Sequence, residues 1–71
     1  MPAVDRLHRQ VMRKIGELQR SKGLSQNYLA DFAGISRSQM SRMLSGKQSP
    51  TLRTLAKIAQ ALEVDLAVLL G

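Results

Sequence analysis

Four polar side chains in one short segment could bind a polyanion. Residues 36–46 read SRSQMSRMLSG, in which Met40, Met43 and Leu44 fall at helical spacing and form one apolar face. When that face is buried, the outward positions are Arg37, Ser38, Ser41 and Arg42. Guanidinium and hydroxyl groups without a neighbouring carboxylate suit the phosphates and base edges of a nucleic-acid groove.

Helix caps predict that this segment is the second of two short helices joined by a tight turn. Ser25 and Ser36 can each accept a hydrogen bond from a first-turn N–H, and Gly34 and Gly46 can end the two helices. The second start is stronger, because residues 36–39 match a capping box, S-x-x-Q. The helix between Ser25 and Gly34 is expected to bury Leu29, Phe32 and Ala33.

Three further helices complete an all-α prediction of five helices. A first helix over residues 4–22 has the apolar stripe Leu7, Val11, Ile15 and Leu18, followed by Gly23 and Leu24. A fourth helix is capped by Thr51 and buries Leu52, Leu55, Ile58, Ala59 and Leu62. A short last helix, Leu66 to Leu70, is capped by Asp65. We expect one compact domain over residues 1–71.

Composition limits the classes of partner. The formal net charge is +6, and no acidic residue lies between Asp31 and Glu63, which favours nucleic acid or an anionic membrane surface. A membrane role for the basic first helix is disfavoured, because that helix lacks tryptophan and has an ordinary core stripe. Without cysteine, a signal peptide or a membrane-spanning run, we expect a cytoplasmic protein with no metal site and no cofactor.

An enzymatic reading has little support. His8 lies three residues from Asp5, and this spacing could suggest a catalytic pair. No nucleophile partner, metal-ligand cluster or phosphate-binding loop accompanies the pair, so we expect no enzymatic activity.

The ordered set of motifs resembles the phage repressor and Cro-type (XRE-like) helix-turn-helix family, from about Ile15 to Leu70. The stretches that carry the resemblance are LSQNYLADFAG, Ile35, Ser36, Gly46-Lys47, Pro50 and ALEVDLAVLL. The resemblance implies a compact five-helix, repressor-like DNA-binding domain whose third helix enters the major groove, usually as a dimer.

The resemblance also implies roles for single residues. The positions expected to read base edges are Arg37, Ser38, Ser41 and Arg42. The positions expected to contact phosphates or brace the third helix are Gln26, Ser36, Lys47 and Thr51. The plainer alternatives are that the serines and Gln26 act only as helix caps and the arginines are solvated surface charges.

The sequence departs from the family pattern in two places. Gln19 and Leu44 stand where many relatives pair an arginine with a glutamate, and apolar packing can replace such a buried ion pair without loss of stability. Glu63 stands where a glycine is common after the fourth helix. The tightness of that turn is therefore open.

Two functions remain from different classes. The first is a sequence-specific double-stranded DNA-binding transcriptional regulator, a repressor, that inserts helix 36–45 into the major groove. The alternative is an antitoxin or other interaction protein that neutralises a protein partner and binds its own promoter. A toxin-binding protein usually needs surface beyond the five helices, and the end of the chain at Gly71 favours the first function.

The apolar C-terminus predicts a homodimer on a near-palindromic operator. Six apolar residues stand within seven positions: Val64, Leu66, Ala67, Val68, Leu69 and Leu70. A short terminal helix turns one face to its own core, so the remainder could be buried across a two-fold axis. The contacts expected there are Val64, Leu66 and Leu70. The alternative is that all six cap the core and the protein dimerises only on DNA.

Overall fold

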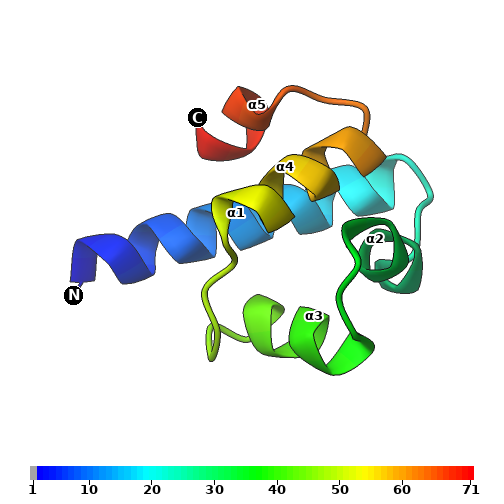
Figure 1. Cartoon of the computed structure of the whole chain (residues 1–71). Helices are drawn as coiled ribbons and strands as arrows, with labels where there is room; N and C mark the ends of the chain where they lie inside the picture. The colour runs from blue at the N-terminus through cyan, green and yellow to red at the C-terminus, as the bar shows by residue number, and fades with distance from the viewer. Residues whose placement is uncertain (1) are drawn as a thin grey trace.

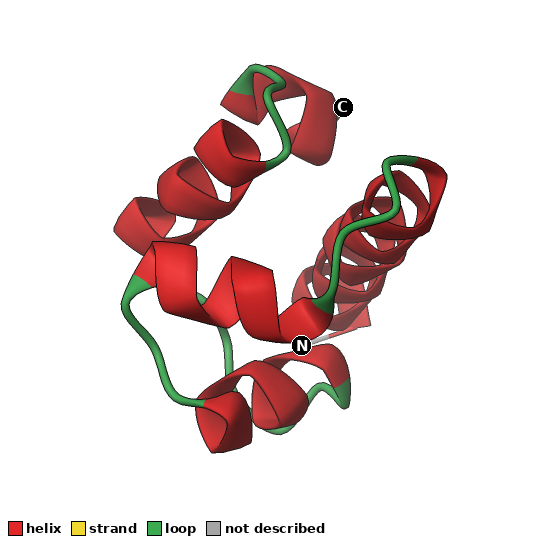
Figure 2. Ribbon diagram, turned by 90° about the vertical axis from the view of Figure 1, so that its right-hand side faces the viewer, coloured by secondary structure: helices red, strands yellow, loops and turns green. Residues whose placement is uncertain are grey.

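The computed structural model describes the backbone of residues 2–71 and the side chains from Asp5 onward. The helices are α1 (Pro2–Ser21), α2 (Gln26–Ala33), α3 (Arg37–Leu44), α4 (Leu52–Ala61) and α5 (Leu66–Leu70) (Figure 1). The rest of the described chain forms turns and loops without strands, which confirms the all-α, five-helix prediction (Figure 2). The first residue of the expected 1–71 domain lies outside the described residues.

Side-chain and glycine caps set most of the helix boundaries. Ser25 Oγ accepts a hydrogen bond from the Tyr28 N–H at 3.0 Å, and Thr51 Oγ1 accepts one from the Thr54 N–H at 3.1 Å. Gly34 ends α2 in the left-handed conformation, with φ of 72°. Helix α1 begins two residues before its predicted start, with Pro2 at a position that tolerates the missing N–H.

One predicted cap is wrong in its chemistry. Asp65 has the extended backbone of a helix N-cap, but its side chain makes no capping hydrogen bond. Helix α5 has only five residues and follows the turn at Glu63. Packing against α1 and α4, rather than a capping carboxylate, therefore holds it in place.

The helices surround a single apolar core. Helix α2 packs against α3 and α4, while α5 packs against α1 and α4. Helices α3 and α5 lie on opposite sides of the molecule, at the bottom and top of both ribbon views (Figures 1 and 2). The buried side chains are Val11, Met12, Ile15, Leu29, Ala30, Ala33, Met40, Met43, Leu55, Ile58, Ala59, Ala61, Leu62 and Leu69.

Three residues expected in the core are instead exposed: Leu7, Phe32 and Leu52. Leu7 lies in the second turn of α1 and Leu52 is the first residue of α4, so both are near the start of a helix, at the edge of the core. Phe32 lies on the flank of α2, because Leu29, Ala30 and Ala33 occupy the side of that helix that faces the core. Its ring lies 6.0 Å from that of Tyr28, centroid to centroid. Helical periodicity found these apolar faces correctly but gave the wrong limits for the core.

The turn after α4 is tight although it contains no glycine. Glu63 has φ of 59°, and its N–H donates to Gln60 O at 3.1 Å. The next N–H, of Val64, donates to Ala59 O at 3.0 Å, which closes the end of the helix. A residue with a Cβ in this left-handed conformation loses about 1–2 kcal/mol relative to the right-handed one.

Replacing Glu63 with glycine should therefore stabilise the fold. The strain that is relieved is larger than the free-energy cost of glycine's greater freedom in the unfolded state. The free energy of unfolding should therefore rise by about 0.5–1 kcal/mol. Urea unfolding should show a higher midpoint with an unchanged slope. As a control, Gln10→Gly in the interior of α1 should lower stability by about 1 kcal/mol. A Glu63→Gly midpoint at or below that of the wild type would contradict the strain at this turn.

Candidate nucleic-acid interface

The start of α3 is fixed by a complete capping box. Ser36 Oγ accepts a hydrogen bond from the Gln39 N–H at 3.0 Å, and Gln39 Oε1 accepts one from the Ser36 N–H at 2.9 Å. Met40 and Met43 are each only 2% exposed and anchor α3 on the core. Leu44 is half-buried against the same core, and Gln19, the other position that departs from the family pattern, donates its side-chain N–H to Leu24 O at 2.8 Å. The cap and the buried face together determine which side of α3 points outward.

The outward side carries the four expected base-reading residues. All four are exposed: Arg37, Ser38, Ser41 and Arg42. Residues at i and i+4 share a helix face, so Ser41 follows Arg37 one turn later and Arg42 follows Ser38 in the same way. The exposed surface of α3 is therefore a strip of guanidinium and hydroxyl groups.

A hollow of about 350 Å³ joins α2 to this strip. It is lined by Gln26 and Asn27 from α2 and by Arg37, Ser38, Met40 and Ser41 from α3. The structure thus brings Gln26 beside the first turn of α3, where a bracing or phosphate-binding side chain would have to lie. Asn27 was not among the expected residues, although its place after Gln26 on an exposed part of α2 was a usable signal.

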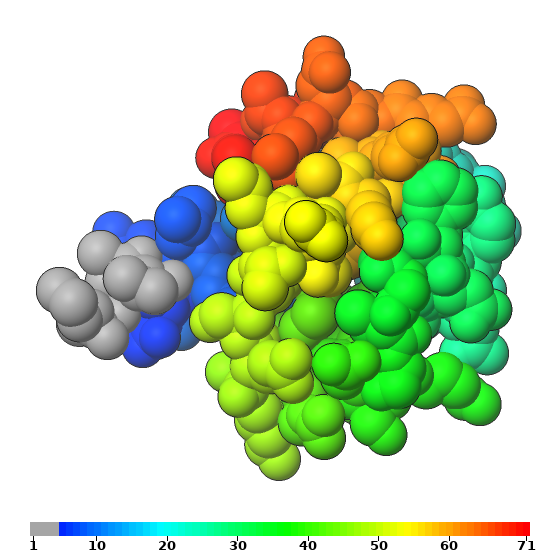
Figure 3. Space-filling view, viewed as in Figure 1, coloured from blue at the N-terminus to red at the C-terminus, as the bar shows by residue number. Residues whose placement is uncertain are grey.

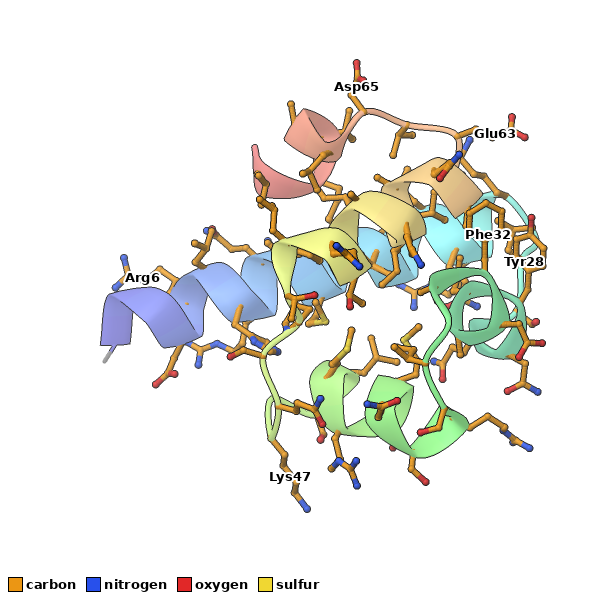
Figure 4. The ribbon with its side chains drawn as sticks, viewed as in Figure 1. Arg6, Tyr28, Phe32, Lys47, Glu63 and Asp65 are labelled. Atoms are coloured by element: carbon orange, nitrogen blue, oxygen red, sulfur yellow. The ribbon has the colours of Figure 1, made fainter. Side chains whose placement is uncertain are left out.

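The other end of the strip is closed by a hydrogen-bonded loop. The N–H groups of Lys47 and Gln48 both donate to Arg42 O, at 2.9 and 3.2 Å. The Arg42 Nε–H donates to Gln48 Oε1 at 3.1 Å. A guanidinium has five N–H donors, so four remain for a ligand. Lys47 extends from this loop away from the core (Figure 4). The loop therefore restrains Arg42 and presents Lys47.

Ser36 and Thr51, whose hydroxyl groups are expected to contact phosphates, differ in whether the hydroxyl hydrogen is already donated within the protein. Ser36 Oγ acts only as an acceptor, so its O–H hydrogen is free to donate to a phosphate. The Thr51 O–H already donates to Thr54 Oγ1 at 3.0 Å. Thr51 would have to exchange that bond for a phosphate contact, whereas Ser36 would not.

The charge on this surface is not neutralised within the described part of the chain. Among residues 5–71 the structure contains one ion pair, Arg13–Glu17 on α1, with 3.8 Å between Arg13 Nε and Glu17 Oε1. Arg37, Arg42 and Lys47 have no carboxylate oxygen within 4 Å. Their positive charge is therefore available to an anionic partner.

A second hollow, of about 160 Å³, is lined mainly by apolar side chains where α1, α4 and α5 meet. Figure 3 shows the blue part of α1, the yellow start of α4 and the red end of α5 on one side. Leu7 and Leu70 line the hollow and are 48% and 46% exposed. Val64 and Leu66 are half-buried against the core. Of the three expected dimer contacts, Leu70 is therefore the one with the most surface to offer.

Comparison with known proteins places this geometry in a family. The sequence profile of the helix-turn-helix family (HTH_3) matches residues 17–69. The chain belongs to this family of DNA-binding domains. The match covers α2, α3 and α4 completely, together with the last five residues of α1 and all but the last residue of α5.

Several relatives of this helix-turn-helix domain are known. The chain is 44% identical over 50 residues to the SPbeta prophage-derived uncharacterized HTH-type transcriptional regulator YonR of Bacillus subtilis (strain 168), which is 70% of this chain and 46% of that protein. It therefore spans about half the length of this curated relative. The restriction-modification controller protein C.AhdI from Aeromonas hydrophila has a TM-score of 0.79 and 31% identity, over 87% of this chain and 94% of that one.

A helix-turn-helix regulator from Vibrio cholerae is equally similar in structure. Its crystal structure has a TM-score of 0.79 and 31% identity, over 92% of this chain and 36% of that one. Membership of this family of non-enzymatic DNA-binding domains confirms that the chain is not an enzyme. No helix in the described residues has the length and apolar character needed to cross a membrane.

His8 has a structural contact in this helix-turn-helix domain. Its Nε2 lies 2.8 Å from Met43 O, so the side chain reaches from α1 to the end of α3. Sequence reasoning weighed His8 only against Asp5 and missed this bond. A side chain that joins a backbone carbonyl 35 positions away leaves no local pattern in the sequence.

Proposed function

We propose that this chain is a sequence-specific, double-stranded DNA-binding transcriptional regulator that acts as a repressor. Residues 36–45 enter the major groove, where Arg37, Ser38, Ser41 and Arg42 contact base edges. Gln26, Ser36, Lys47 and Thr51 contact phosphates or brace α3. The whole domain, residues 1–71, acts as one unit in the cytoplasm.

One observation carries this proposal: the exposed side of α3 holds two arginine–serine pairs and no carboxylate. An arginine can donate two hydrogen bonds to guanine O6 and N7, and serine can bond to several base edges. A helix also fits the width of the major groove. Occupation of a promoter by the domain would exclude other proteins from the same DNA, which is the basis of the repressor assignment.

Selection of bound duplexes from a random pool tests the proposal directly. The wild-type protein should enrich one near-palindromic sequence at moderate salt concentration. A protein carrying Arg37→Ala and Arg42→Ala should not enrich it. Enrichment of no sequence by the wild type would contradict sequence-specific binding.

Arg37→Ala and Lys47→Ala should have different effects on DNA binding. If Arg37 is bidentate to guanine, Arg37→Ala should cost about 1–3 kcal/mol on the selected site and relax preference at one position. Lys47→Ala should weaken binding to every sequence alike and reduce the salt slope by about one per subunit. Titration of single-base operator variants measures both effects.

Lys22→Ala is the matched control, because Lys22 lines a hollow with Ala61, Leu62 and Glu63 at the end of α4, and no residue of α3 or α5 lines that hollow. It removes one positive charge without changing the proposed interface, so affinity should change little. An Arg37→Ala protein that loses affinity equally on every variant would make Arg37 a phosphate contact and overturn its assignment to base reading.

The active species in this proposal is a homodimer. One recognition helix contacts only a few base pairs, and two-fold symmetry places two of them about 34–36 Å apart. Each α3 would then lie about 17 Å from the axis, which is compatible with a domain whose longest dimension is 31 Å. The exposed Leu70 and Leu7 beside the apolar hollow support an interface at that end of α5. The other two proposed contacts, Val64 and Leu66, are half-buried against the core.

A further inference from the structure

One hydrogen bond joins α1 to the end of the proposed recognition helix. A carbonyl oxygen can only accept, so His8 Nε2 carries the hydrogen and donates to Met43 O at 2.8 Å. The other side-chain hydrogen bonds of the described residues join positions at most six apart, whereas this one joins positions 35 apart. His8 precedes residues 17–69, which match the family profile.

The acceptor of this bond lies at the junction between α3 and its loop. Met43 O also accepts the Gly46 N–H at 3.2 Å, and Gly46 has φ of 84°. The next two N–H groups bond to Arg42 O, and the Gln48 side chain holds the Arg42 guanidinium. The bond from His8 therefore fixes the turn that orients Arg42 and presents Lys47.

This end of α3 is also anchored by Met43, which is buried in the core, and by the half-buried Leu44. Among the described residues, the bond from His8 is the hydrogen bond that joins this end to another helix. Helix α2 is its main packing neighbour, and the hollow shared with α2 lies at the first turns of α3. His8 itself is half-buried and borders two hollows, one lined by Leu7, Val11 and Pro50 and the other by Ser45 and Gly46 of the loop after α3. The side chain thus lies between the edge of the core and the loop after α3, and its Nε2–H points at the end of α3.

We infer that His8 is a positioning residue for DNA reading: it holds the C-terminal end of α3 so that Arg42 meets the groove. This inference rests on the proposed function of α3. It adds a residue outside the matched family segment to the determinants of specificity. His8 itself need not touch DNA.

Two substitutions of His8 separate the hydrogen bond from the packing. His8→Phe keeps a ring of similar size among the apolar neighbours but removes the donor. His8→Gln replaces the ring with an amide whose Nε2 hydrogens can donate at similar reach. Loss of one such bond should weaken binding to the selected duplex about three- to tenfold in His8→Phe, and His8→Gln should restore most of it.

The loss should be selective. In His8→Phe, base preference should relax at the position read by Arg42 and remain at the position read by Arg37. A double variant, His8→Phe with Arg42→Ala, should lose less affinity than the product of the two single losses, because both remove the same contact. A uniform loss on all sequences, or losses that multiply, would overturn the inference.

Amide hydrogen exchange tests the positioning without DNA. In His8→Phe the Gly46, Lys47 and Gln48 amides should exchange about three- to tenfold faster, while the core amide of Leu62 keeps its rate. In His8→Gln all four should keep wild-type rates. Equal acceleration at Leu62 would make His8 a general stability residue, and unchanged loop amides would remove the anchor. Absence of selective DNA binding by the wild type would instead contradict the proposed function, and exchange would still decide the role of His8.

Discussion

Raising the salt concentration from 50 to 200 mM is expected to weaken DNA binding about a thousandfold. The acid-free segment between Asp31 and Glu63 holds Arg37, Arg42, Lys47, Arg53 and Lys57. If about three of these neutralise phosphates in each subunit, a dimer releases about six counterions, and the log–log slope is about −5. A titration by fluorescence anisotropy at five or more salt concentrations measures the slope.

Two controls make the salt response specific. Sucrose at matched osmolality should leave affinity nearly unchanged, because it does not compete for phosphates. Lys22→Ala should keep the wild-type slope, since Lys22 lies beside Glu63 at the end of α4, outside the proposed DNA-binding surface and away from the proposed dimer contact. A flat response to salt would contradict the proposal that this surface binds DNA.

Replacing Leu70 with lysine is expected to dissociate the proposed dimer. Leu70 is 46% exposed, and each copy buried across a two-fold axis would contribute about 1 kcal/mol. Two lysines brought together at the same contact also repel each other and resist desolvation. The dissociation constant of the dimer should therefore rise by about a hundredfold or more. Sedimentation equilibrium of the free protein measures it.

Phe32→Lys is the matched control for charge and exposure. Phe32 is 40% exposed on α2, far from α5 in Figure 4, and the substitution adds the same single charge. It should leave the dimer intact, whereas Leu70→Lys should also lose the preference for a full operator over a half-site. The dimer proposal fails if the wild type stays monomeric at high concentration and binds a single half-site as tightly as a full operator.

Much of the fold could be predicted because its boundaries are set by local chemistry. Ser25, Ser36, Gly34 and Thr51 act within four residues of their own positions, so the sequence contains both partners of each cap. The limits of the core could not be predicted in the same way. Whether Phe32 is covered depends on how α2 lies against α4, which no residue of α2 determines alone.

The same distinction between local and long-range determinants applies to the candidate site. The exposure of Arg37, Ser38, Ser41 and Arg42 follows from the two buried methionines, and periodicity alone was enough to predict it. Their surroundings could not be predicted, because Asn27 and His8 approach α3 from other helices. The acceptor for His8 is a backbone carbonyl, a group that every residue has and that therefore leaves no mark in the sequence.

The two methionines beneath α3 give this domain room to evolve. Their side chains are flexible and polarisable, so they can adjust to small shifts of the helix above them without leaving a void. The residues that we propose to read DNA lie on one face of α3, and the residues that pack into the core lie on the other. A change of target sequence can therefore arise by exchanging Arg37, Ser38 or Ser41 while Met40 and Met43 stay in place.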